Sequence, residues 1–206
     1  MSECGFDFTV RTNEIDETPP PGLLRSEIAM KLAEMKSDAL RNTLTEKEIL
    51  ITADTIVCLD ELVLNKPEDA QHALEMLRML SGKVHQVYTG VCISSKIKKI
   101  VFSCETDVEF NLLSDELIQS YVTEYSPFDK AGSYGAQECL PEGLNPCSEA
   151  EKQFIRSIGM PDLFENTLVQ TGKESIPIIK KITGSYFNVM GLPIVELTNQ
   201  LNSFID

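Results

Sequence analysis

The alternation of apolar and polar positions along the chain predicts an α/β protein. Apolar residues recur at helical spacing from Leu24 to Leu44 and again from Pro67 to Gly82, which predicts two amphipathic helices. Between them, ILITADTIVCLD (residues 49–60) is rich in β-branched and apolar residues and predicts a buried strand. FDFTV (Phe6–Val10) alternates like a further short strand. Helices that alternate with strands favour a mixed, twisted sheet with flanking helices around a cleft.

The second half of the chain predicts a hairpin and three more helices. VHQVYTGVCISS and KIVFSCETDVEF are two strand-like runs joined as a β-hairpin. LSDELIQSYVTEY predicts a helix with Ser114 as its N-cap, and PIVELTNQLNSF predicts a last helix begun by Pro193. Residues from about Leu140 to Ile182 are poorly periodic and predict one helix, Glu149–Ser157.

Composition and charge narrow the class of protein. The chain has 206 residues, of which 42% are hydrophobic and 24% charged, as in an ordinary soluble globular protein. We therefore expect no membrane span and, because the N-terminus lacks the pattern of a signal peptide, a cytoplasmic location. The net charge of −14 argues against a nucleic-acid partner, which needs a basic surface. The six cysteines form no C-x-x-C pair, and with only two histidines we expect no zinc site.

Four polar clusters stand apart from this pattern: Asp16–Glu17 in a proline-rich turn, Asp54–Thr55 within the apolar strand, Lys66 before a helix, and DKAGSYGAQ, which contains Asp129, Lys130, Tyr134 and Gln137. Each has a plain alternative explanation, namely a solvated turn, a strand-end Asx turn, a surface charge and a polar loop. A buried carboxylate, however, is costly without a partner or metal.

Together the clusters favour chemistry on a nucleotide. Carboxylates that converge on a cleft bind Mg²⁺ or Mn²⁺, lysines neutralise phosphate oxygens, and a glutamine can read a pyrimidine edge. A carboxylate can also orient or deprotonate an attacking water. Acyl transfer is not indicated, because His72 lies in a predicted helix and His85 in a predicted strand, with no serine apparent beside either.

The order of these motifs resembles the Maf family of nucleotide pyrophosphatases. ADTIVCLDELVLNKPEDAQHALEMLRMLSGKVHQVYTGV resembles its central motif, DKAGSYGAQE a second and ITGSYFNVMGLPIVEL a third. IDE (Ile15–Glu17) and LAEMKSDAL resemble weaker upstream motifs. The resemblance covers almost the whole chain and implies a single Maf-like domain over residues 1–206, with a cleft between two lobes.

The resemblance also implies residue roles. Asp54 corresponds to the catalytic aspartate, the proton acceptor for the attacking water, and Thr55 and Gln137 to positions linked to base choice. Five positions are expected around the metal and phosphates, with Glu17 and Asp54 as the metal ligands: Glu17, Lys36, Lys66, Asp129 and Lys130. The A-D-T version of the motif resembles the subgroup that acts on dTTP and UTP. A homodimer is a further arrangement that we consider.

The chain departs from the family pattern at two places. The usual N-terminal strand and S-x-S-P-R-R phosphate-binding loop do not occur in it, so either the natural start lies upstream or a phosphate-binding loop has been lost. The segment 140–182 is longer than the usual link between the last two motifs, and it is either a surface insertion without catalytic consequence, an excursion near the cleft or a dimer contact. A smaller change is Asn65, which replaces the glycine of G-K-P.

The functional hypothesis is a pyrophosphatase that converts dTTP or UTP to the monophosphate and pyrophosphate, with Mg²⁺ or Mn²⁺ as cofactor. Two alternatives remain open. One is a nucleotide-binding protein with a regulatory role in cell division that no longer turns over substrate, and the other is an enzyme for modified or purine nucleotides.

Overall fold

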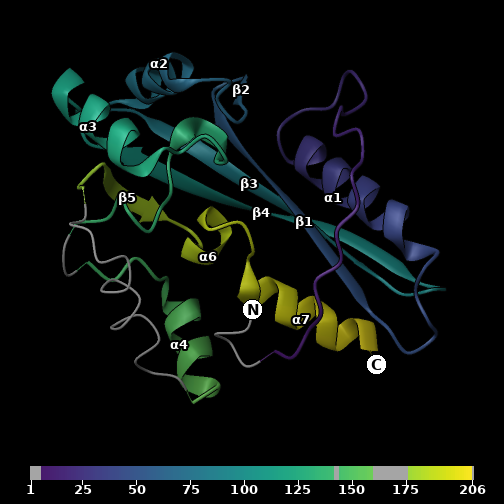
Figure 1. Cartoon of the computed structure of the whole chain (residues 1–206). Helices are drawn as coiled ribbons and strands as arrows, with labels where there is room; N and C mark the ends of the chain where they lie inside the picture. Colours follow the sequence, from purple (N-terminus) through teal and green to yellow (C-terminus); the bar gives the residue numbers. More distant parts are fainter. Residues whose placement is uncertain (1–5, 142–143, 160–175, 206) are drawn as a thin grey trace.

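The computed structural model describes residues 6–141, 144–159 and 176–205. Their strands form one five-stranded sheet in the order β2-β1-β3-β4-β5 (Figure 1). The strands are β1 Leu50–Leu59, β2 Leu62–Leu64, β3 Val84–Ser94, β4 Lys99–Phe110 and β5 Ile179–Thr183. The helices are α1 Ser26–Arg41, α2 Ala70–Leu80, α3 Asp115–Tyr125, α4 Glu149–Ser157, α6 Tyr186–Val189 and α7 Ile194–Ile205, with a 3₁₀ turn at Ala131–Ser133.

The predicted α/β class is confirmed, whereas the mixed sheet is not observed. Each of the four strand pairings in the described part of the chain is antiparallel. The alternation of strands and helices suggested parallel neighbours, and α2 does connect two strands that run in the same direction, β2 and β3. β1 lies between these two strands and runs in the opposite direction, so β2 and β3 do not pair with each other and each pairs antiparallel with β1.

The predicted helices and hairpin are found, with small shifts at their ends. α4 has the predicted bounds, Glu149–Ser157, and Ser114 caps α3 by accepting a hydrogen bond from the backbone N–H of Leu117. The second predicted helix begins at Ala70 rather than Pro67, because Asp69 is its N-cap.

One strand prediction was wrong, and one strand was missed. Residues 6–10 form no strand, and four of these five residues are exposed. Alternation alone does not make a strand, since the backbone also needs a neighbouring strand to pair with. Conversely, β5 lies in the segment that seemed aperiodic, where it adds to the outer edge of β4. Much of the predicted insertion at 140–182 lies outside the described residues.

Helices cover both faces of the sheet. The main hydrophobic core lies on one face, between the sheet and helices α2, α3, α4, α6 and α7, and a smaller cluster under α1 lies on the other face. Figure 1 shows α1 and α7 on opposite sides of the long strands. Residues two apart on a strand share a face, so each face of β1 contributes its own set of side chains.

Helix α1 approaches the sheet closely because small residues line its inner side. Ala29, Ala33 and Ser37, spaced four residues apart, are fully buried. Opposite them on β3 is Gly90, where an added Cβ would lie 2.2 Å from the carbonyl carbon of Ala29. Only glycine permits this approach of helix backbone to strand backbone.

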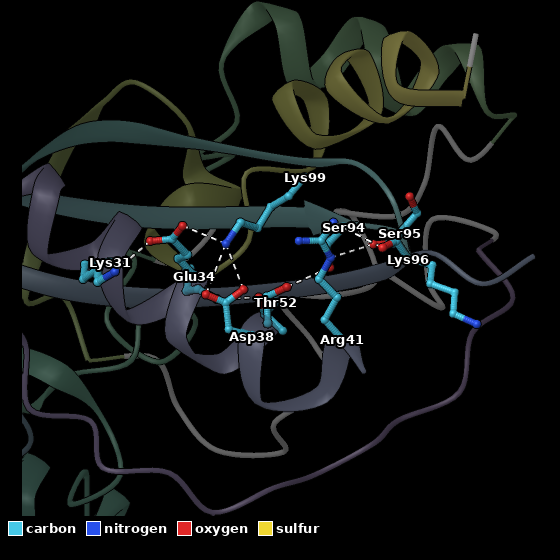
Figure 2. Close-up of polar contacts among 11 residues, drawn as sticks. Lys31, Glu34, Asp38, Arg41, Thr52, Ser94, Ser95, Lys96 and Lys99 are labelled. Carbon is cyan, nitrogen blue, oxygen red and sulfur yellow. Dashed lines mark hydrogen bonds and ion pairs between the residues drawn. The ribbon is translucent and has the colours of Figure 1, made fainter. Parts of the chain in front are cut away.

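Polar contacts hold α1 on strand β1 and on the β3–β4 hairpin (Figure 2). Lys99 Nζ lies 2.8 Å from carboxylate oxygens of both Glu34 and Asp38. Arg41 donates to the carbonyl of Ser95 at 2.8 Å, and Thr52 of β1 donates to the carbonyl of Ala33 at 2.6 Å. These contacts fix the position of the helix along the sheet.

Candidate active site

A pocket of about 750 Å³ lies where α1 and β1 meet the segments 129–137 and 189–191. Its volume is in the range of small-molecule sites. All eight site residues expected from the sequence line it: Glu17, Lys36, Asp54, Thr55, Lys66, Asp129, Lys130 and Gln137. They come from five separate parts of the chain, and their roles remain predictions.

Asp54 lies at the centre of β1, on the face covered by α1. Its side chain is only 12% exposed, and its Oδ1 accepts a hydrogen bond from Lys36 Nζ at 2.5 Å. Burial raises the pKa of Asp54, and the nearby ammonium group of Lys36 opposes that rise. The lysine therefore favours the ionised form of a carboxylate that burial disfavours.

Lys36 joins two carboxylates. Its Nζ lies 2.5 Å from Asp54 and 3.3 Å from Oε1 of Glu17, in the segment before α1. Burial is the largest influence on the pKa of Lys36 and lowers it, but Asp54 and Glu17 together outweigh burial, so the pKa is raised. Lys36 is therefore a permanent positive charge at neutral pH.

The remaining charged residues of the lining come from the segment after β2 and the segment before the 3₁₀ turn. Lys130 Nζ donates to Oδ1 of Asp129 at 2.9 Å, and this bond lowers the pKa of Asp129. Lys66 precedes α2, and the neighbouring Asn65 carbonyl accepts a hydrogen bond from Gly132 of the 3₁₀ turn at 3.3 Å. The pocket thus holds three lysines, suited to phosphate oxygens.

The opposite face of β1 supplies the uncharged part of the pocket. Thr55, next to Asp54 in sequence, points to that face and lies 2.8 Å from the hydroxyl of Thr89 on β3. Gly191 lies beside Thr55, and Gln137 Nε2 lies 3.9 Å from the sulfur of the adjacent Met190. The pocket therefore combines a charged region suited to phosphates with an uncharged region suited to a base.

The carboxylates fit a hard divalent cation only in part. Among the described residues, no group of three His, Cys, Asp or Glu side chains is placed to hold a metal ion. Mg²⁺, however, is commonly held by one or two carboxylates together with substrate phosphates. Asp54 and Glu17, on either side of Lys36, are carboxylates suited to such a shared site.

Several residues that support the pocket were not predicted from the sequence. Glu151 of α4 is fully buried, and it accepts hydrogen bonds from Ser185 Oγ at 2.7 Å and from the backbone N–H of Phe187 at 2.9 Å. The turn 185–191 carries Asn188, whose carbonyl accepts from Thr89 at 3.0 Å. The Ser148-x-x-Glu151 spacing of a capping box was a readable signal for α4, but not for its contact with the turn.

Among the described residues, no helix has both the length and the apolar character needed to cross a membrane.

Comparison with known proteins places the chain in a family. The model of the Maf-like protein family matches residues 1–161. A dTTP/UTP pyrophosphatase of Bacteroides thetaiotaomicron is 42% identical over 202 residues, covering 98% of this chain and 87% of that protein. Proteins of the same name from Porphyromonas gingivalis and Parabacteroides distasonis are 40% and 38% identical, covering 93% and 99% of this chain and 80% and 89% of those proteins. On the family match and these relatives together, the chain belongs to the Maf-like protein family.

Proposed function

We propose that this protein hydrolyses dTTP and UTP to the nucleoside monophosphate and pyrophosphate. The observation that carries the proposal is Asp54, a largely buried carboxylate that is ion-paired to Lys36 in a pocket with two further lysines. The similarity to relatives named dTTP/UTP pyrophosphatase supports the choice of substrate.

The residues divide the work of the reaction between them. Lys36, Lys66 and Lys130 bind and orient the phosphate oxygens, and Asp54 accepts the proton of the water that attacks phosphorus. Lys36 favours the ionised, proton-accepting form of Asp54 against the effect of burial, which raises the pKa of this carboxyl. Asp54 and Glu17 would hold a Mg²⁺ or Mn²⁺ ion, which when bound would supply additional positive charge to the phosphates.

The pocket and the cysteines fit an enzyme that acts on the nucleotide pool of the cytoplasm. Five cysteines in the described part of the chain are free thiols, as expected in a reducing compartment: Cys58, Cys92, Cys104, Cys139 and Cys147.

The test is pyrophosphate release from dTTP and UTP with Mg²⁺ or Mn²⁺ present. We expect Asp54→Asn to reduce kcat by at least about 10²-fold, the lower end of what a proton acceptor contributes. Asp60→Asn is the matched control, because Asp60 lies in the β1–β2 turn, outside the pocket lining. Unchanged release by Asp54→Asn would refute the assigned role. Nucleotide binding without release would instead indicate the non-catalytic binding protein.

A further inference from the structure

The uncharged region of the pocket contains a hydrogen-bond chain whose direction can be worked out. Thr89 Oγ1 lies 3.0 Å from the carbonyl oxygen of Asn188 and 2.8 Å from Thr55 Oγ1. A carbonyl oxygen only accepts, and a hydroxyl has one proton to donate. The proton of Thr89 is therefore committed to Asn188, so Thr89 must accept from Thr55.

This assignment fixes what Thr55 offers to a ligand. Its single proton points to Thr89, inside the protein, and only lone pairs of its oxygen remain for the pocket. Thr55 is thus an acceptor towards the pocket, although a threonine in isolation can be either donor or acceptor.

The Asn188 carbonyl, which sets the direction of these hydrogen bonds, is held in place by several contacts of its own residue. The Asn188 side-chain amide donates to the Val87 carbonyl and to Thr106 Oγ1, both at 3.0 Å. Its backbone N–H donates to Ser185 Oγ at 3.0 Å, and Ser185 in turn donates to the buried carboxylate of Glu151 at 2.7 Å. The turn cannot easily rotate to offer Thr89 a donor in place of this carbonyl.

We propose that Thr89, acting with the Asn188 carbonyl, is a positioning residue that sets Thr55 as a hydrogen-bond acceptor and so selects bases that present an N–H to it. Thymine and uracil carry a proton on N3, whereas the N3 of cytosine is itself an acceptor. If Thr55 Oγ1 faced N3 of cytosine, two acceptors would meet and neither could form a hydrogen bond. An unpaired buried polar group is costly, so the pocket discriminates strongly against cytosine. The inference rests on the proposed function for the orientation of the nucleotide.

Thr89→Val tests this directly, because valine has nearly the same shape without the hydroxyl. The Asn188 carbonyl stays paired, since it also accepts from the backbone N–H of Gly191 at 3.0 Å. The proton of Thr55 becomes free to turn into the pocket. Thr89→Ser keeps the hydroxyl and is the rescue variant. Thr52→Val is the matched control, since it makes the same change on the opposite face of β1.

The measurement is the affinity for the non-hydrolysable α,β-imido analogues of dTTP and dCTP, and of the N3-methylated thymidine nucleotide, by calorimetry. We expect the wild type to prefer the thymine analogue over both others. Thr89→Val should reduce each preference at least about tenfold, while Thr89→Ser and Thr52→Val should keep them. Thermal unfolding of each variant checks that it is folded.

The outcomes separate this inference from the proposed activity. Unchanged preferences in Thr89→Val, or preferences lost equally in Thr89→Ser, overturn the inference even if the enzyme hydrolyses dTTP. Preferences that depend on the hydroxyl of residue 89 support it even if no pyrophosphate is released. A wild-type protein that binds none of the analogues, or does not distinguish them, contradicts it.

Discussion

Replacing Gly90 by alanine should damage both stability and catalysis. Gly90 is paired with Asp54 across β1 and β3, directly beneath α1. The new Cβ would lie 2.2 Å from the Ala29 carbonyl carbon and 2.3 Å from the backbone nitrogen of Met30, whereas ordinary contact begins near 3.4 Å. Because both neighbours are backbone atoms, α1 must move away by about 1.2 Å, the difference between these distances.

The size of the effect follows from that movement. Overpacking of this kind costs up to about 3 kcal/mol, which lowers the Tm of a protein of this length by roughly 6–12 °C. The movement also lengthens the 2.5 Å contact between Lys36 and Asp54 beyond hydrogen-bonding distance. A misplacement of about 1 Å can reduce the rate by about 10²-fold.

The assay is thermal unfolding together with pyrophosphate release from dTTP, below the Tm of the variant. Ser103→Ala is the control, since Ser103 is paired with Gly90 from β4 and is exposed. If the loss acts through Lys36, Gly90→Ala should cost little further activity in a Lys36→Met background. A Gly90→Ala variant with wild-type kcat/KM would refute the reasoning.

Two further predictions concern buried ionisable groups. In Glu151→Gln, an NH₂ group replaces one of the carboxylate oxygens that accept hydrogen bonds from Ser185, Phe187 and Ser148. The free energy of unfolding, measured in urea, should therefore fall by about 2–4 kcal/mol. The control is Glu149→Gln at an exposed position on the same helix, which should leave the urea midpoint unchanged. Burial lowers the pKa of His85 to about 3 from 6.5, so the unfolded chain binds its proton more readily, and stability should fall as the pH drops below 6.5. As the pH falls from about 7.5 to about 5.5, His85 should lower the free energy of unfolding by about 1.4 kcal/mol. An equal loss in His85→Gln would contradict that assignment.

Much of the architecture could be predicted from local pattern. The helix at Glu149–Ser157 and the β3–β4 hairpin depend on capping, periodicity and turn residues that are close together in sequence. The strand predicted at Phe6–Val10 failed, and β5 was missed, because pairing with a distant strand is not visible in a short window of residues.

The site residues also divide into those that a short stretch of sequence indicates and those that depend on contacts between distant segments. Seven of the eight predicted residues lie in polar clusters that stand apart from the apolar pattern, and Lys36 was added by the resemblance to the family. Thr89 and Asn188 were missed because their contribution is the direction of a hydrogen bond between segments about a hundred residues apart. Gly90 carried a readable signal, since a glycine inside an apolar strand often marks a close backbone approach.

The adjacency of Asp54 and Thr55 has a consequence for how such an enzyme diverges. In the proposed mechanism, the backbone of β1 separates Asp54, assigned to the hydrolysis, from Thr55, assigned to base choice. Asp54 is contacted from helix α1, whereas Thr55 is contacted through Thr89 by the turn that contains helix α6. On that proposal, substitutions at Thr89 and in the turn 185–191 can alter which nucleotide is accepted while the reaction itself is preserved. A slip of one residue in β1, by contrast, would exchange the two sets of side chains and abolish both properties at once.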